Sequence, residues 1–219
     1  MEQPENHMIG IIGVQLLDNS GNVARTCSRF PTLVTFFSQI LGLNHIFPGY
    51  FPSHFMKEWD HRESREVDQV MGAFFLIRRS LFQRLGGFDE RFFVYFEDLD
   101  LSYRAWKSGW KSFYLADAQA YHKGGGTTRQ IKDRRLFYSL RSRILYSYKH
   151  FGWWSATAVT LMTLIVEPFT RLAWATVRCS GTEIVNTLKG YLMLWRAMPA
   201  TLKEVRRRGR HESATSFTL

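Results

Sequence analysis

The segment VYFEDLDLSYRAW (residues 94–106) places an aromatic and β-branched run directly before three carboxylates, Glu97, Asp98 and Asp100. Acidic side chains favour the first turn of a helix, where backbone N–H groups lack partners and the helix dipole is positive. Gly109 follows at a typical helix stop. We therefore predict a helix over residues 98–108 that carries negative charge at its start.

These carboxylates allow two interpretations. Asp100 and Arg104 are four residues apart, so Asp100 has a simple explanation as half of a surface ion pair. Glu97 and Asp98 could cap the helix, which is worth about 1 kcal/mol. Alternatively, a carboxylate at the mouth of a helix and against an apolar wall can act as a general base towards an incoming hydroxyl. The residues by themselves leave both interpretations open.

The composition indicates one globular core with an appendage: the chain has 219 residues, of which 45% are apolar and 16% aromatic. The net charge of +10 suits nucleic acid, an anionic membrane or phosphorylated substrates. The two cysteines, Cys27 and Cys179, are far apart and indicate neither a zinc site nor a disulfide framework, which fits a reducing cytoplasm. The first seven residues are polar and acidic, so we expect no signal peptide there.

The residues around the opening segment alternate between strand-like and helix-like patterns, which predicts an α/β fold. We expect a buried strand in MIGIIGVQLLD (8–18) with a turn at DNSGN (18–22), and a strand buried on both faces in VMGAFFLIRR (70–79). Helices are predicted for PTLVTFFSQILGL (31–43) and for SLFQRLGGFD (80–89), the latter ended by its glycine pair. The polar stretch 51–68 is expected to be a surface excursion.

Four motifs occur in a specific order: MGAFFLIRR, GGFDERFFVYFEDLDL, the pair GW and YHKGGG. In this order they resemble the catalytic domain of glycosyltransferase family 2, over about residues 8–130. The similarity is greatest to the rhamnosyltransferase-like members that build bacterial cell-surface polysaccharides such as lipopolysaccharide. The resemblance implies a GT-A-type, Rossmann-like fold. It also implies inverting transfer of a sugar such as rhamnose from a nucleotide-diphosphate donor to a lipid-linked or cell-surface glycan.

The same resemblance implies roles for individual residues. Asp98 becomes the catalytic base and Glu97 its positioning neighbour, while Gly72 and Ala73 form the floor of the sugar and acceptor pocket. His122 becomes a contributor to the metal-diphosphate site, although a lone histidine at a strand end is otherwise a polar edge residue. The glycine loop with Gly124, Gly125 and Arg129 could close over a diphosphate, or could be an ordinary hinge.

The chain departs from the family pattern in one respect. Such enzymes hold a divalent metal, Mg²⁺ or Mn²⁺, with an Asp-x-Asp motif in a nucleotide-binding half, and no such acidic cluster precedes residue 68. Asp98-Leu99-Asp100 is not taken as this motif, because its context matches the acceptor side of the family. We therefore expect an incomplete domain that lacks the metal and donor half and is inactive alone, with another chain as a possible source of that half. The alternative is a non-catalytic remnant or membrane-bound accessory module that binds a partner chain.

Residues 131–210 are predicted to form a basic, aromatic helical region that associates with membranes, followed by a disordered tail at 211–219. The uncharged run in GWWSATAVTLMTLIVEPF (152–169) is about sixteen residues long, short of the ~20 that span a bilayer, and begins with tryptophans suited to the headgroup level. VNTLKGYLMLWRAM (185–198) is amphipathic and a basic cluster follows it. We favour helices lying in the interface over a core helical pair or a true span, on the cytoplasmic face of the inner membrane. Nucleic acid is not expected, because no base-reading module is present.

Overall fold

The computed structural model describes residues 8–123 and 131–215, with side chains up to Arg206. The described chain divides into two compact units. The sheet unit comprises residues 8–35, 44–90 and 97–123. The helical unit comprises residues 36–43, 91–96 and 131–215.

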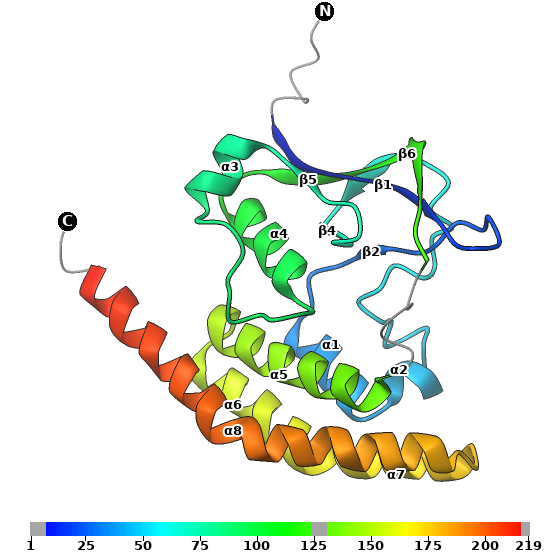
Figure 1. Ribbon diagram of the computed structural model, residues 1–219, viewed down its shortest axis with the longest axis vertical. Coiled ribbons are helices and arrows are strands. Elements are labelled where there is room, and N and C mark those ends of the chain that lie inside the picture. Colours follow the sequence, from blue (N-terminus) through cyan, green and yellow to red (C-terminus); the bar gives the residue numbers. More distant parts are fainter. Residues whose placement is uncertain (1–7, 124–130, 216–219) are drawn as a thin grey trace, which may run out of the picture. The chain divides into compact units, whose positions relative to one another are not determined.

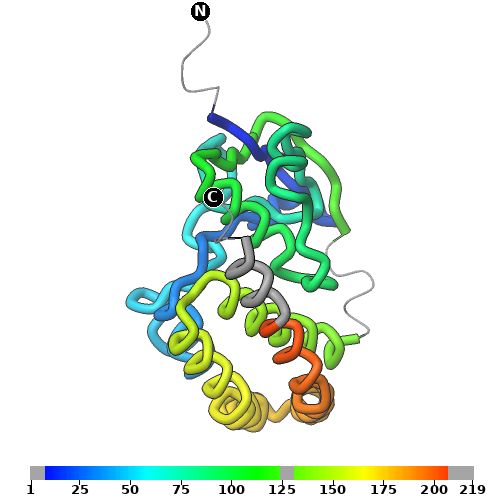
Figure 2. The backbone as a smooth tube through the Cα atoms, turned by 90° about the vertical axis from the view of Figure 1, so that its left-hand side faces the viewer, coloured from blue at the N-terminus to red at the C-terminus, as the bar shows by residue number. Residues whose placement is uncertain are grey.

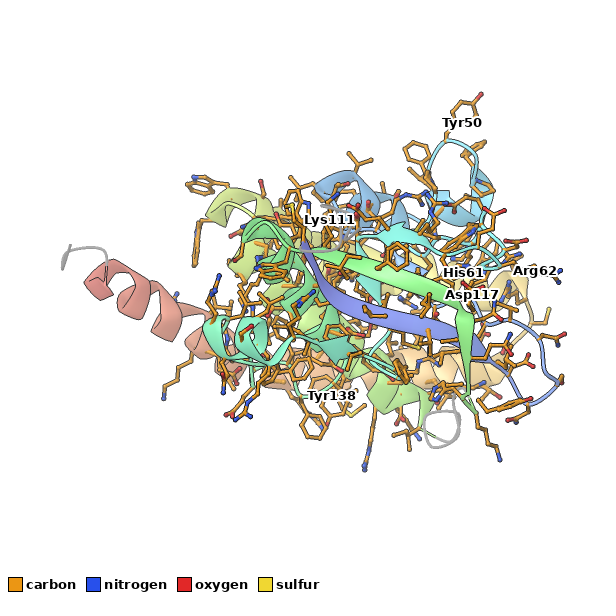
Figure 3. All side chains as sticks on the ribbon, turned by 90° about the horizontal axis from the view of Figure 1, so that it is seen from above. Tyr50, His61, Arg62, Lys111, Asp117 and Tyr138 are labelled. Carbon is orange, nitrogen blue, oxygen red and sulfur yellow. The ribbon has the colours of Figure 1, made fainter. Side chains whose placement is uncertain are left out.

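The sheet unit is built on a four-stranded sheet with the order β3-β6-β1-β5 (Figure 1). Strands β1 (Ile9–Leu17) and β6 (Lys111–Tyr121) pair in parallel along most of their length. In Figure 3 these two strands run side by side, with Lys111 and Asp117 marking the course of β6. Two short strands, β3 (Arg65–Val67) and β5 (Leu76–Ile77), add to the edges in antiparallel orientation. The predicted first strand is confirmed, and the α/β class fits the mixture of helix and sheet.

The predicted turn after β1 is also confirmed. The Asp18 carboxylate accepts hydrogen bonds from the N–H groups of Ser20 at 2.8 Å and Asn22 at 2.9 Å. Gly21 adopts a φ of 76°, which glycine reaches without steric cost.

A second, two-stranded sheet pairs β2 (Cys27–Ser28) with β4 (Gln69–Val70) in antiparallel orientation. Helix α4 (Glu97–Lys107) packs against β4 and β6, and α3 (Arg79–Arg84) ends at the predicted glycine pair, where both glycines have a φ of 73°. The buried apolar core of this unit consists of Ile11, Cys27, Met56, Val67, Val70, Leu81, Ala105, Tyr114 and Ala116. Residues of β4 and α4 therefore pack in the same apolar core as residues of the four-stranded sheet.

The prediction of one buried strand over residues 70–79 is wrong. Strand β4 ends at Val70, a turn follows, and β5 begins at Leu76 in the other sheet. Leu76 is 58% exposed, because β5 lies at the edge of its sheet. The ladder does not resume after Val70, because the N–H of Gly72 donates to a side chain, Asp98, instead of to a neighbouring strand. A continuous apolar run cannot reveal such a break.

The prediction of a surface excursion over residues 51–68 is also wrong in part, because His61 is fully buried within it. Its Nε2 accepts the N–H of Cys27 at 3.1 Å, so Nδ1 carries the proton and donates to the Trp59 carbonyl at 3.0 Å. The His61 carbonyl accepts the side chains of Gln15 at 2.8 Å and Tyr114 at 3.0 Å. Burial lowers the pKa of His61 and favours the neutral ring.

The helical unit contains the long helices α5 (Lys132–His150) and α8 (Gly181–Thr215), which pack against each other through Leu140, Ile144, Tyr191, Leu194 and Met198. These helices can be followed by colour in Figure 2, from green through yellow to red. Helix α1 (Leu33–Ile40), most of which belongs to this unit, confirms the predicted helix after Pro31. Helix α2 (Leu43–Ile46) is a single turn, most of which belongs to the sheet unit. The expected tail at 211–219 falls on the last turns of α8 and on residues 216–219, outside the described chain.

Between α5 and α8 the chain forms α6 (Trp153–Leu161), a π-helical turn η2 (Met162–Val166) and α7 (Glu167–Val177). Together they make one helix of 25 residues, Trp153–Val177, which by length and composition could cross a membrane. The uncharged run ends earlier, at Glu167, but the helix continues because Arg143 and Arg171 pair with that carboxylate. A count of uncharged residues therefore underestimates the length of this helix.

Candidate active site

The Asp98 carboxylate is held by two backbone N–H groups at the start of α4. Gly72 donates to Oδ2 at 2.7 Å and Leu99 donates to Oδ1 at 2.8 Å. The predicted helix is confirmed, and it places this partly buried carboxylate in the first helical turn. Each oxygen retains lone-pair capacity after these bonds, so the group can still accept a proton from a ligand.

Burial raises the pKa of Asp98 above its usual value, and the hydrogen bonds from the backbone N–H groups of Gly72 and Leu99 only partly oppose this effect. Burial also raises the pKa of Glu97, with a further increase from the neighbouring charge of Asp98. The Glu97 Oε2 atom is buried and has no hydrogen-bond partner among the described residues. Both carboxylates are therefore stronger proton acceptors than exposed acids.

Gly72 is required here by the close approach of Asp98. A Cβ atom built on Gly72 would lie 3.2 Å from Asp98 Oδ2, closer than ordinary van der Waals contact. The structure thus brings Gly72, from the turn after β4, to the predicted base Asp98 of α4. Ala73, the other residue of the predicted pocket floor, follows Gly72 and is exposed.

The chain enters α4 through a strained backbone. Tyr95 and Phe96 have φ angles of 64° and 69°, a region that bulky residues rarely adopt. The Phe96 ring is held against Phe36 and Tyr146, with centroid distances of 6.2 Å and 5.5 Å. Strain of this kind gathers at functional sites, where surrounding packing maintains it. Nothing in the sequence could have indicated it, because aromatic residues do not favour a positive φ.

The predicted pair between Asp100 and Arg104 is confirmed, but its surface location is wrong. Asp100 is fully buried, and Arg104 Nε donates to its Oδ2 at 2.8 Å. The remaining guanidinium nitrogens of Arg104 donate to the carbonyls of Leu85 at 2.6 Å and Gly87 at 2.7 Å. The pair therefore ties α4 to the end of α3, and the Asp100 carboxylate has a structural role.

The other predicted site residues do not join this cluster in the described chain. His122 is exposed just beyond β6, where its backbone N–H donates to the Leu17 carbonyl at 2.9 Å. Gly124, Gly125 and Arg129 lie outside the described residues. The proposed contribution of His122 to a diphosphate site and the lid over it both stay predictions.

The described residues do not fit a metal centre. Within 8–123 and 131–206, no group of three or more His, Cys, Asp or Glu side chains is placed to hold an ion. The carboxylates of the Asp98-Leu99-Asp100 sequence already have other partners. Asp98 accepts hydrogen bonds from backbone N–H groups, and Asp100 forms an ion pair with Arg104. Members of the family commonly use a divalent metal, but we assign no metal-dependent step to these residues.

Comparison with known proteins gives one family and several relatives. Residues 1–194 match the model of the family "Glycosyl transferase family group 2". An N-acetylglucosaminyl-diphospho-decaprenol L-rhamnosyltransferase of Mycobacterium tuberculosis (strain H37Rv) is 31% identical over 153 residues, which cover 67% of this chain and 48% of the relative. The rhamnosyltransferase WbbL of Escherichia coli (strain K12) is 31% identical over 119 residues, covering 54% of this chain and 42% of the relative.

The chain thus spans about half the length of the curated relatives it matches. The family match extends over most of the chain and includes the strand, the glycine turn and the helix that form the Asp98 site. The resemblance seen in the sequence motifs is confirmed. The chain belongs to glycosyl transferase family group 2 and is similar to its rhamnosyltransferases.

Proposed function

We propose that this chain provides the acceptor side and the catalytic base of an inverting sugar transferase. Asp98 takes the proton from an acceptor hydroxyl while the hydroxyl oxygen attacks the anomeric carbon of the donor sugar. The bond from that carbon to the nucleoside diphosphate breaks, and the diphosphate leaves with its electron pair. The observation that carries this proposal is a carboxylate fixed by two N–H groups, with a pKa raised by burial.

The names of the relatives support a proposal for the substrates. The mycobacterial relative is named for transfer of rhamnose to a diphospho-decaprenol carrying N-acetylglucosamine. We extend this to a nucleotide-diphosphate sugar such as a rhamnose donor, and to a lipid-linked glycan as acceptor. Glu97 supports the base by position, because its buried carboxyl group lies next to Asp98 in the same helical turn.

The proposed location is the cytoplasmic surface of the inner membrane, with the helical unit as the membrane-associating part. The helix Trp153–Val177 exposes one apolar stripe at helical spacing, and α8 exposes another. The Trp195 indole donates to the Leu164 carbonyl at 3.3 Å, which brings the two stripes together. We call them the apolar face: Leu161, Ile165, Phe169, Val177, Leu188, Leu192 and Trp195.

A peripheral arrangement suits this face better than a span. Glu167 lies near the middle of the long helix and is buried inside the helical unit with Arg143, which favours a helix that remains packed on its neighbours. Exposed basic residues lie on or next to the same helices as the apolar face, and their charge would match the negative charge of a lipid surface: Arg178, Lys189, Arg196 and Lys203.

The test is an Asp98→Asn variant in a strain that lacks the native gene. We expect sugar transfer to the lipid-linked acceptor to fall by about 10²–10⁴-fold, the usual contribution of a general base. The matched control is Asp60→Asn, which changes an exposed carboxylate in a loop. Thermal unfolding of Asp60→Asn should resemble that of the wild type. Asp98→Asn should stay folded but unfold at a somewhat lower temperature, because its amide oxygen can accept only one of the two backbone N–H groups that the carboxylate accepts.

Near-normal transfer by Asp98→Asn would reject the base assignment. Absence of transfer by the wild-type chain in every background would instead favour the second candidate, an accessory module that binds a partner chain. That candidate has one observation in its favour: the described residues contain no group of three or more His, Cys, Asp or Glu side chains placed to hold a metal ion.

A further inference from the structure

A short irregular segment leads into the helix that carries the candidate base. Residues 91–96, which we call the entry segment, belong to no helix or strand and lie directly before α4, where Asp98 is the second residue. An irregular segment has no ladder of backbone hydrogen bonds of its own, so other groups must hold it in one conformation. The position of Asp98 therefore depends on what the entry segment contacts.

Two carbonyls of the entry segment accept hydrogen bonds from neighbouring side chains of α5. Arg141 Nη1 donates to the Arg91 carbonyl at 2.9 Å, and the Ser142 hydroxyl donates to the Val94 carbonyl at 3.0 Å. Arg141 is itself held by α8, because its Nη2 donates to both carboxylate oxygens of Glu204, at 2.9 Å and 2.7 Å. An ion pair of this geometry fixes the planar guanidinium, so Nη1 remains directed at the carbonyl.

Aromatic side chains of the entry segment pack on the same helix. The Phe93 ring lies 5.1 Å from the Tyr138 ring, and the Phe96 ring lies 5.5 Å from the Tyr146 ring. The positive φ angles of Tyr95 and Phe96 are unfavourable for bulky residues and persist only when the surrounding contacts impose them. Helix α5 therefore holds the entry segment at its start, in its middle and at its end.

We propose that Arg141 and Ser142 are positioning residues for sugar transfer: from α5 they hold the entry segment in the conformation that places the Asp98 carboxylate on the N–H of Gly72. This inference rests on the proposed function of Asp98. It gives the helical unit a part in the reaction itself, in addition to the proposed association with a membrane.

The physical reason is the short covalent path from the entry segment to the base. Only Glu97 separates Phe96 from Asp98, so a displacement of the entry segment also moves the start of α4. A general base must lie within hydrogen-bond reach of the proton that it accepts, and a misplacement of about 1 Å can lower the rate about 100-fold. Loss of either hydrogen bond from α5 should therefore affect the reaction more than it affects substrate binding.

The first measurement needs no catalytic activity. The Gly72 N–H donates to Asp98 Oδ2 at 2.7 Å, so its hydrogen exchange with solvent, followed by NMR, reports whether the carboxylate stays in place. We expect Arg141→Gln and Ser142→Ala to speed this exchange by about tenfold. The amide groups of β1 are the internal reference, because a general loss of stability would speed their exchange as well. Arg135→Gln is the matched control, since Arg135 is exposed on the same helix.

If Arg141→Gln fails to fold, Ser142→Ala carries the test, since it removes a single hydroxyl group from α5. Exchange of the Gly72 amide that stays unchanged relative to β1 in every folded variant overturns the inference. An increase of equal size in Arg135→Gln also overturns it, because the effect would not be specific to the bonds with the entry segment.

The second measurement separates kcat from KM for sugar transfer. In Arg141→Gln and in Ser142→Ala, kcat should fall by about tenfold or more with little change in the acceptor KM, because the substrate still binds while the base is misplaced. Arg141→Lys should recover part of kcat, since its ammonium group can again donate to the Arg91 carbonyl.

The two measurements also distinguish this inference from the proposed function. If exchange of the Gly72 amide rises and kcat does not fall, the positioning role is rejected. If neither changes while Asp98→Asn is inactive, the proposed function stands and the role of Arg141 and Ser142 is rejected. Near-normal transfer by Asp98→Asn rejects the proposed function, and the positioning role with it.

Discussion

Asp98 accepts a hydrogen bond from Gly72, which is 26 residues away in the chain, and its geometry depends on the absence of a side chain at Gly72. The N–H of Gly72 could serve as a donor in any residue type, but only glycine leaves room for the carboxylate oxygen. At the residue scale, the position of the Asp98 carboxylate therefore depends on its close approach to the backbone of Gly72.

This close approach predicts the effect of Gly72→Ala. The added methyl group would meet Asp98 Oδ2 at 3.2 Å, so the carboxylate must shift by a few tenths of an ångström. We expect sugar transfer to fall by about tenfold or more, because a base must lie within hydrogen-bond reach of its proton. The thermal midpoint should change little, since the residue is exposed.

Gly49→Ala is the control for this variant, because a Cβ atom at Gly49 meets nothing within 4 Å. It should transfer sugar at the wild-type rate. Full activity of Gly72→Ala would show that the Asp98 carboxylate does not have to occupy this position.

At the element scale, the helical unit depends on a buried ionic cluster beside the π-helical turn η2. Arg143 of α5 donates to Glu167 of α7 and to the Thr163 hydroxyl at 3.0 Å. Arg171 Nε donates to the other Glu167 oxygen at 2.9 Å. Burial alone would raise the pKa of Glu167, but the two arginines outweigh it and hold the pKa below its usual range. The cluster therefore joins α5 to α7 across the interior of the unit.

We expect Glu167→Gln to destabilise the protein by about 3–5 kcal/mol, the usual cost of leaving a buried charge without its partner. The loss should be measured by chemical denaturation with a helix signal. Glu63→Gln, at an exposed loop residue, should stay within about 0.5 kcal/mol of the wild type.

The pH dependence of this stability has a definite sign. A carboxylate with a lowered folded pKa contributes stability above its unfolded pKa of about 4.3, and this contribution is lost as pH falls through the folded value. The wild type should therefore lose stability below about pH 4.3, and Glu167→Gln should lose less over the same interval. Parallel pH curves for the two proteins would contradict the assigned role of Glu167.

At the scale of the whole molecule, the apolar face of the helical unit is a set of large apolar side chains that stay exposed among the described residues. Phe169 is 70% exposed and Val177 is 76% exposed, although both are apolar. Large exposed apolar patches mark interaction surfaces, and basic residues along this one match anionic lipid. A peripheral transferase acting on a lipid-linked acceptor would use such a face to stay near its substrate.

We expect Phe169→Asp to weaken binding to phosphatidylglycerol-containing vesicles by about tenfold or more, because the variant replaces an aromatic ring that the lipid would bury with a charge. Flotation with vesicles measures this directly, and high salt should further release the variant. Tyr50→Asp is the control, since Tyr50 is 86% exposed in the sheet unit. Unchanged flotation of Phe169→Asp at low and high salt would reject the apolar face as the membrane surface.

The sequence by itself determined the features that depend on neighbours in the chain. The turn after β1, the glycine stops of α3 and α4, the pairing of Asp100 with Arg104 and the acidic start of α4 all follow from signals within a few residues. The ordered motifs also identified the family, because their combination is specific even though each motif alone is weak. Short-range hydrogen bonding and steric preference act in the same way in the unfolded and folded chain, so they can be predicted from the residues alone.

Only the tertiary structure decided the contacts between distant segments. Ser28 and Gln69 are 41 residues apart, and nothing local shows that their side chains meet. The break in the 70–79 strand, the buried His61 and the partners of Glu167 arise in the same way. The physical reason is that a buried polar group must find a partner wherever the fold brings one, and its pKa and reach depend on that partner and not on its neighbours in sequence.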